Sequence, residues 1–224
     1  AKEIIDDALR LSKYLTINDM PRKDSLELIN APTNALSVLA IIYIALNQFD
    51  KAESVYLELI EKMEYIVGKD SERYIKEFPT YLSSLAGVYA EKNNYLKSLK
   101  YYNQAINILK ELNLKEPHAY YPKLATTISS CATMLNYFDN WNQAEPLVKE
   151  SLEMFRLLST FDNYYIVNLV FDLNLMANIY VNTNRPIDAL KFINEALIVA
   201  HENKSFVSQT LSDYTYELLS NVVP

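Results

Sequence analysis

A pattern of small residues that recurs about every 46 residues constrains the fold of this chain more than any other feature. Four alanines lie 46, 46 and 45 residues apart, at positions 40, 86, 132 and 177. Each is followed twelve residues later by another small residue: Ala52, Ser98, Ala144 and Ala189. Self-similarity at such a period is typical of stacked repeat proteins. Small residues allow two antiparallel helices to approach closely, so each repeat is predicted to be a pair of packed helices.

One stretch shows the expected unit most clearly. Between Leu82 and Leu112, two apolar stripes with helical spacing flank a short polar break at residues 92–94. This pattern predicts a helical hairpin, with a first helix to about Glu91 and a second helix from Tyr95. Applied to the whole chain, the pattern predicts one solenoid domain over residues 1–224, with these parts: a partial preceding repeat and linker at 1–32, hairpins at 33–68, 79–114, 120–160 and 163–203, and a capping helix at 205–222.

These positions resemble the tetratricopeptide repeat (TPR). The small-residue position of that family matches the four alanines, and its first-helix aromatic matches Tyr43, Tyr89 and Tyr180, with Leu135 as a departure. The long period is similar to that of the kinesin-light-chain-like subgroup. The resemblance implies an all-α, TPR-like right-handed superhelix (an α-solenoid) of about four full repeats plus terminal helices.

Composition excludes several classes of function. The net charge is −7, with 21 basic and 28 acidic residues, which disfavours nucleic acid and anionic membrane surfaces as partners. No run of 18 apolar residues is present, so we expect no direct membrane insertion by this chain. Two glycines argue against Gly-rich phosphate loops, and the single cysteine, Cys131, excludes an intrachain disulfide.

The chain shows no catalytic pattern. The two histidines, His118 and His201, lie in different repeats and lack the neighbours that a metal site needs. No nucleophile motif, phosphate loop or dinucleotide fingerprint occurs. We therefore expect no enzyme activity, no cofactor and no metal. We expect an intracellular location, with the cytoplasm first and an organelle such as the mitochondrion left open.

Two glutamates, Glu53 and Glu145, stand where the second residue of a helix capping box is expected. Asp50 with Glu53, and Asn142 with Glu145, stand near the predicted starts of second helices. In such a box the second residue reaches back to the backbone of the first. Both pairs are therefore predicted to cap their own helices.

The resemblance also implies which residues bind a partner. In this family the first helices line a concave groove, and the matching positions give the candidate partner-binding residues Val38, Ile41, Ile44, Ser83, Ser130, Asn136, Asn174, Asn178 and Asn182. The last three are spaced i, i+4 and i+8 and share a helix face. Asparagine amides both donate and accept hydrogen bonds, and in several such proteins they grip extended peptides. The alternative is that these are ordinary solvated helix residues.

Three functions remain open. The first is an adaptor or scaffold that binds a peptide segment or helix of another protein in this groove. The second is a structural subunit of a larger complex, and the third is a regulatory domain of a larger enzyme or a peptide sensor. Association of two copies through the terminal helices is also left open. The carboxylate clamp of chaperone-binding members is excluded, because Ser37, Val38, Ser83 and Gly87 stand where it needs basic residues.

Overall fold

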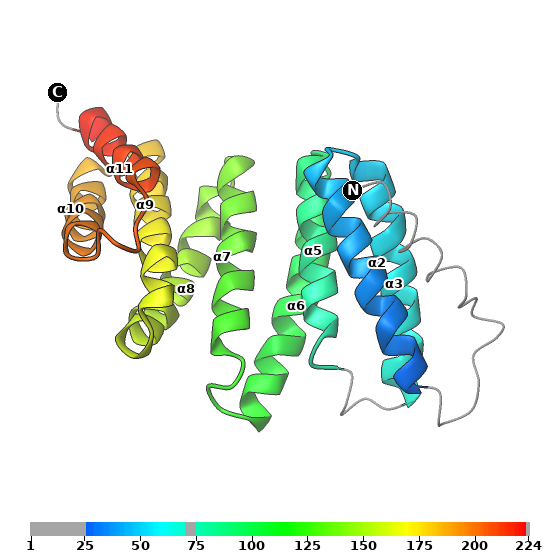
Figure 1. Cartoon of the computed structure of the whole chain (residues 1–224). Coiled ribbons are helices and arrows are strands. Elements are labelled where there is room, and N and C mark those ends of the chain that lie inside the picture. Colours follow the sequence, from blue (N-terminus) through cyan, green and yellow to red (C-terminus); the bar gives the residue numbers. More distant parts are fainter. Residues whose placement is uncertain (1–25, 70–74, 223–224) are drawn as a thin grey trace. The chain divides into compact units, whose positions relative to one another are not determined.

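The computed structural model describes residues 26–69 and 75–222 (Figure 1). These residues form α-helices and one short 3-10 helix, and no strand occurs among them. The elements, in chain order, are α2 (Leu26–Ala45), α3 (Phe49–Lys69), α5 (Phe78–Glu91), α6 (Tyr95–Lys115), α7 (Tyr121–Tyr137), α8 (Trp141–Phe161), η3 (Asn163–Tyr165), α9 (Ile166–Asn182), α10 (Pro186–Glu202) and α11 (Gln209–Val222). The all-α fold built of consecutive hairpins is confirmed.

The chain divides into two compact units, Ala1–Leu109 and Lys110–Pro224. Unit 1 holds the hairpin of α2 and α3, followed by α5 and most of α6. Its core joins these helices through buried apolar side chains that include Leu36, Tyr56, Leu82 and Tyr89. The single solenoid domain expected over residues 1–224 stays a prediction.

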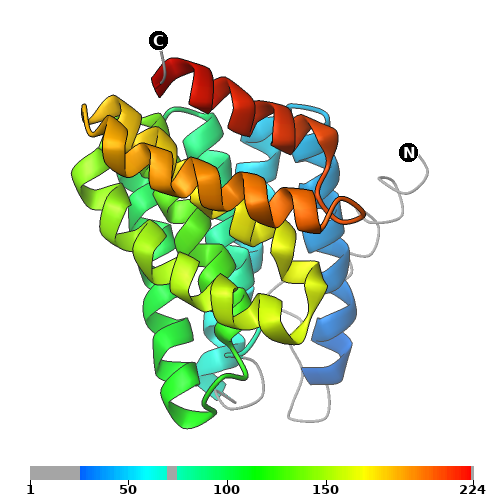
Figure 2. The same ribbon diagram turned by 90° about the vertical axis from the view of Figure 1, so that its left-hand side faces the viewer.

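Unit 2 contains the hairpins α7–α8 and α9–α10, with α11 after them. Its core is formed mainly by α8, α9 and α10, with Phe155 and Leu173 fully buried. Figure 2 shows α11 lying against α10, and α11 also contacts α9. The helix predicted at 205–222 begins at Gln209, and its role as a cap stays a prediction.

The predicted repeat register is confirmed by burial. The four alanines that define the period are all fully buried, and so are the four small residues twelve positions later. In the second hairpin the contact is direct, because the Ser98 hydroxyl donates a hydrogen bond of 2.8 Å to the Ala86 carbonyl oxygen. The small residues thus lie where two helices of one hairpin touch.

The start of the first hairpin differs from the prediction. Helix α2 begins at Leu26, within the segment that we expected to be a linker because it holds Pro21 and Pro32. A proline removes one backbone donor and can bend a helix without ending it, and the residues before Pro32 include the helix formers Leu26, Glu27 and Leu28. The partial preceding repeat expected at residues 1–16 lies outside the described residues.

All four hairpins turn through the same backbone geometry. A residue seven positions after each buried alanine has a positive φ of 55° to 57°: Asn47, Asn93, Asp139 and Asn184. In each case the next backbone N–H donates to the carbonyl five residues earlier, as in Asn94 to Tyr89 at 2.8 Å. This is the Schellman ending of a helix, which needs a left-handed residue. Asn and Asp tolerate that conformation better than other residues with a side chain.

Replacing Asn93 tests this geometry. Asn93→Gly should raise the free energy of unfolding by up to about 1 kcal/mol, because glycine adopts a positive φ without a steric penalty. Asn93→Val should lower it by roughly 1–2 kcal/mol, because a β-branched residue is strained there. Chemical denaturation of both variants measures the two effects. Equal stabilities for the glycine and valine variants would contradict the left-handed turn.

Candidate functional site

In unit 1, the predicted groove residues on α2 are the most accessible. Val38 and Ile41 are 47% and 57% exposed, whereas Ile44 packs partly against the core of this unit. On α5, Ser83 is half-buried and its hydroxyl donates to the carbonyl of Thr80 at 3.0 Å. The apolar groove candidates Val38 and Ile41 are therefore accessible on α2, while Ser83 is engaged within its own helix.

In unit 2, two predicted asparagines of α9 form a short relay of hydrogen bonds. The Asn182 amide donates to Asn178 Oδ1 at 2.9 Å, and the Asn178 amide donates to the Tyr214 hydroxyl at 3.3 Å. Asn182 is exposed and Asn178 is half-buried. On α7, Ser130 and Asn136 are half-buried. The structure thus brings Asn178 and Asn182 together, and it adds a tyrosine that sequence reasoning missed.

The structure corrects the prediction for Asn174. This residue is only 1% exposed, and its Nδ2 donates to Thr215 Oγ1 of α11 at 2.9 Å. It is therefore covered by the C-terminal helix and is not available to a partner. Helical periodicity correctly placed Asn174 on the same face of α9 as Asn178 and Asn182, but it could not reveal that α11 packs over this point.

A buried carboxyl that sequence reasoning did not single out lies in the same helix as the asparagines. Asp172 is fully buried in α9 and accepts hydrogen bonds from the hydroxyls of Ser129 in α7 and Ser151 in α8, both at 2.5 Å. Burial raises its pKa to about 6, although the two serine hydrogen bonds oppose this rise. Asp172 therefore joins three helices of unit 2.

The contact between Ser129 and Asp172 recurs one repeat later. Ser129 and Asn174 both stand three positions before the buried alanine of their repeat, and they contact Asp172 and Thr215 of the next first helix. Helix α11 therefore packs on α9 in the same register as α9 packs on α7. Thr215 and Leu218 of α11 are buried, while Tyr216 and Glu217 are exposed.

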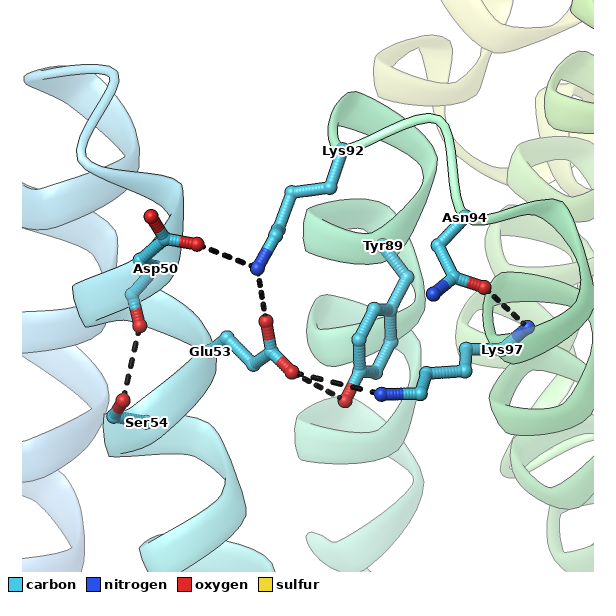
Figure 3. Close-up of polar contacts among 7 residues, drawn as sticks. All are labelled: Asp50, Glu53, Ser54, Tyr89, Lys92, Asn94 and Lys97. Atoms are coloured by element: carbon cyan, nitrogen blue, oxygen red, sulfur yellow. Dashed lines mark hydrogen bonds and ion pairs between the residues drawn. The ribbon is translucent and has the colours of Figure 1, made fainter.

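A charged cluster joins the first two hairpins in unit 1 (Figure 3). Glu53 of α3 accepts a hydrogen bond of 2.8 Å from the Tyr89 hydroxyl of α5, and it is ion-paired with Lys92. Lys92 also contacts Asp50 at 2.6 Å, and the Lys97 ammonium lies 4.7 Å from the centre of the Tyr89 ring. Burial opposes ionisation of Glu53, but the hydrogen bonds from Lys92 and Tyr89 outweigh it and lower its pKa.

An equivalent cluster joins the hairpins of unit 2. Glu145 of α8 accepts hydrogen bonds from the Tyr180 hydroxyl at 3.2 Å, from Arg185 at 2.6 Å and from Lys149 at 2.6 Å. The Arg185 guanidinium lies 4.1 Å from the centre of the Tyr180 ring. The hydrogen bond from Arg185 is the main reason that the pKa of Glu145 falls to about 2.

The two clusters occupy the same repeat positions. Glu53 and Glu145 each stand thirteen residues after their buried alanine, and their tyrosine partners stand three residues after the next one. We call each cluster a carboxylate–tyrosine clasp. The same pair of positions between the second and third repeats holds Leu99 and Leu135, so both members change together. This joint change is a signal in the sequence that would have predicted the clasps.

The clasps also correct the capping-box predictions. Helix α3 begins at Phe49 and α8 begins at Trp141, so Asp50 and Asn142 lie inside their helices and do not precede them. The two carboxylates turn toward the following hairpin because a cationic group and a tyrosine hydroxyl are available there. Charge-assisted hydrogen bonds of this kind are stronger than a contact with a backbone amide alone.

The described residues contain no group of three or more metal-ligating side chains. Cys131 is buried, and burial raises the pKa of its thiol to about 12, so the thiol is protonated and unreactive at neutral pH. One described segment, Asn163–Asn182, is long and apolar enough to cross a membrane. Most of that segment is buried inside unit 2, and a core helix has the same composition. Among the predicted groove residues, those that remain accessible are therefore apolar on α2 and amide-bearing on α9.

Comparison with known proteins agrees with this geometry. Residues 35–67 match the model of the tetratricopeptide repeat family. The chain is similar to the crystal structure of BtubC (BKLC) from P. vanneervenii, with a TM-score of 0.73 and 21% identity over 99% of this chain and 79% of that one. A search of curated proteins finds no match.

Two further solved structures share the fold. A putative kinesin light chain of Podosopora anserina, with nearly identical TPR-like repeats, matches with a TM-score of 0.61 and 12% identity over 84% of this chain and 92% of that one. The apo form of RapI matches with a TM-score of 0.65 and 12% identity over 84% of this chain and 67% of that one. The chain therefore has the fold of TPR-like repeat proteins, which include kinesin-light-chain-like repeats.

Proposed function

We propose that this TPR-like repeat chain, which carries a tetratricopeptide repeat at residues 35–67, is a non-enzymatic protein-interaction module. In this proposal a segment of a partner protein lies on the faces of the first helices, and the chain acts as an adaptor or scaffold. The TPR-like fold supports the class of function, because such repeats are typically interaction scaffolds. The amide relay of Asn182 and Asn178 is the observation that carries the site.

The relay suits a peptide backbone. An extended peptide presents one amide N–H and one carbonyl per residue, and leaving these groups unpaired on burial costs about 1–3 kcal/mol each. Asn182 is exposed and Asn178 is half-buried, so both can meet a bound chain. Each amide side chain offers donors and an acceptor, which lets the same site serve peptides of different sequence.

The proposal predicts that the double variant Asn178→Ala, Asn182→Ala binds its partner more weakly by about 1–3 kcal/mol, because up to two hydrogen bonds are lost. The partner is first captured with the full chain as bait, and the affinity of its binding segment is then measured by calorimetry. A matched control is Asn194→Ala, an exposed asparagine on the second helix α10 of the same repeat.

Unchanged affinity in the double variant would move the site away from α9. If only substitutions on second helices weakened binding, the structural-subunit function would replace the adaptor function. A thermal melt of each variant checks that the fold is retained, and only a small decrease is expected from the loss of the hydrogen bond between Asn178 and Tyr214.

A further inference from the structure

Helix α11 occupies the place of a first helix in the repeat register. Its contact with α9, between Thr215 and Asn174, repeats the contact that Asp172 of α9 makes with α7. Asp172 stands five positions before the buried alanine of its repeat, so the same spacing from Thr215 makes Ser220 the counterpart of that alanine. Ser220 is small, and Leu219 matches the apolar residue that precedes the alanine in the other repeats. The register of first helices therefore continues into α11.

One face of α11 lacks the cover that the other first helices have. In α2, α5, α7 and α9, the residue four positions before the alanine, the residue just before it and the alanine itself are at most 2% exposed. A second helix covers them, as the hydrogen bond from Ser98 of α6 to Ala86 of α5 shows. In α11 the matching residues are Tyr216, which is 58% exposed, Leu219, which is half-buried, and Ser220, which is exposed. We call these three residues the open face of α11.

The open face is separate from the groove predicted for a partner. None of the groove candidates stands at these three repeat positions, and Asn178 of that groove contacts Tyr214 on another side of α11. Helices α9 and α10 pack on α11, yet they leave Tyr216 and Ser220 accessible. What this face lacks, among the described residues, is the equivalent of a second helix.

Residues 1–15 carry the sequence pattern of a second helix. Counted from the small residue that follows each alanine by twelve positions, the side chains four and seven positions later are buried in all four repeats, and the next one is Ile or Leu. The same spacing from Ala1 gives Ile5, Ala8 and Leu9. Charged residues occupy other positions of this segment: Lys2, Glu3, Asp6, Asp7, Arg10 and Lys13. The segment lies outside the described residues, and its sequence predicts a helix with one apolar stripe.

The position of this segment in the chain fits the pattern. Ala40 follows Ala1 by 39 residues, and the corresponding spacing in the later repeats is 33 or 34. A second helix packs on the first helix that follows it, as α3 packs on α5 and α8 packs on α9. Residues 1–15 are therefore expected to pack on α2 of their own copy and to leave open the side where their own first helix would lie.

One further pair of positions links the two surfaces, seven residues before the alanine and 23 residues after it. Uncharged residues hold both positions in the four described hairpins, and in unit 2 both belong to one buried core cluster. In α11 and residues 1–15 the same positions hold Asp213 and Ser12. A serine hydroxyl can donate to a carboxylate, as those of Ser129 and Ser151 do to Asp172. Such a joint change to polar residues is expected where two surfaces pack on each other.

We propose that the open face of α11 binds residues 1–15 of a second copy of this chain. One copy then supplies the first helix of a composite repeat, and the other copy supplies its second helix. Small residues on both sides, Ser220 on α11 and Ala1 and Ala8 on the segment, allow the close approach that occurs within the hairpins. Each hairpin of a repeat array packs only on its neighbours, which disfavours closure within one copy. The contact is heterologous, because each copy uses a different surface, so it adds copies end to end.

Association of the full chain tests this contact. The molar mass measured by analytical ultracentrifugation should exceed that of one copy and should rise with protein concentration. Ser220→Arg on α11 and Ala8→Arg in the segment should each weaken association by about tenfold or more, because a long charged side chain does not fit between packed helices. An equimolar mixture of the two variants should form a complex of one copy of each, since each variant keeps the surface that the other has lost.

Ile198→Arg is the matched control, because Ile198 is an exposed apolar residue on the second helix α10 and the same change there should leave the molar mass unchanged. Tyr216→Arg and Ile5→Arg are second changes on the two surfaces if the first ones alter the thermal melt. The molar mass of one copy at every concentration would overturn the composite repeat, and so would association that survives the changes on both surfaces. Association that both variants lose and the mixture does not restore would contradict a head-to-tail contact.

Discussion

Raising the pH from about 3 to about 7 should lower the stability of unit 2 by roughly 3 kcal/mol through the single carboxyl of Asp172. Its pKa is about 6 in the folded chain against a reference of 3.8, and each pKa unit corresponds to about 1.4 kcal/mol. The folded state therefore holds a proton that the unfolded state has released. The stabilisation is complete below the unfolded pKa and is lost as the pH rises through the folded pKa.

The fluorescence of Trp141 can follow this effect, because it is the single tryptophan of the chain and lies in unit 2. Urea unfolding at a series of pH values gives the slope. The control is Asp172→Asn, whose amide oxygen still accepts hydrogen bonds from Ser129 and Ser151 but which cannot ionise. The difference between the two proteins isolates Asp172 from other titrating groups, including Glu145. Identical pH profiles would mean that Asp172 is already ionised in the folded state.

The second large effect is expected at the contact between α5 and α6 in unit 1. Ala86→Leu should lower the free energy of unfolding by about 1–3 kcal/mol, because the larger side chain must displace Ser98 and break its hydrogen bond to the Ala86 carbonyl. Thermal and urea unfolding, followed by circular dichroism, measure the loss. An unchanged stability would mean that α5 and α6 are not in close contact at this point.

The neighbouring residue supplies a control with the opposite sign. A Cβ added at Gly87 would lie 3.7 Å from the Tyr102 hydroxyl, which is an ordinary van der Waals contact. Gly87 lies inside α5 and has no positive φ. Gly87→Ala should therefore raise stability by about 0.5–1 kcal/mol, because alanine loses less backbone freedom on folding. Opposite signs at adjacent positions distinguish a close contact from general sensitivity of the helix.

The repeat register was predictable because it depends on the size of the residues, which the sequence gives directly. Ala40, Ala86, Ala132 and Ala177 are small in any environment. Each has a second small residue twelve positions later, and only one repeat period aligns all four pairs. The hairpin turns carried a signal of the same kind, since Asn or Asp recurs seven positions after the buried alanine in each of the four repeats. The polar breaks in the sequence predicted where these turns lie, but not that they share a left-handed residue.

The candidate site was less predictable because each side chain has several partners within reach. Glu53 and Glu145 have the spacing of a cap, yet a cationic group and a tyrosine of the next hairpin outweigh the local backbone. Asn174 stands on the predicted face, but its environment depends on α11, which is 41 residues away in the chain. Local periodicity cannot rank such distant contacts, whereas a comparison of equivalent positions between repeats would have indicated the clasps.

The clasps bear on how the chain avoids folding with its repeats in the wrong order. Every hairpin presents similar small residues and similar apolar stripes, so packing alone would let a hairpin pair with a wrong neighbour or with another chain. The position held by Glu53 and Glu145 in two hairpins is held by Leu99 in another. A hairpin that brought Glu145 against leucine would bury a carboxylate away from its cationic partners, which is strongly unfavourable. The charged residues of the clasps therefore disfavour wrongly paired hairpins and reduce misfolding by exchange between copies.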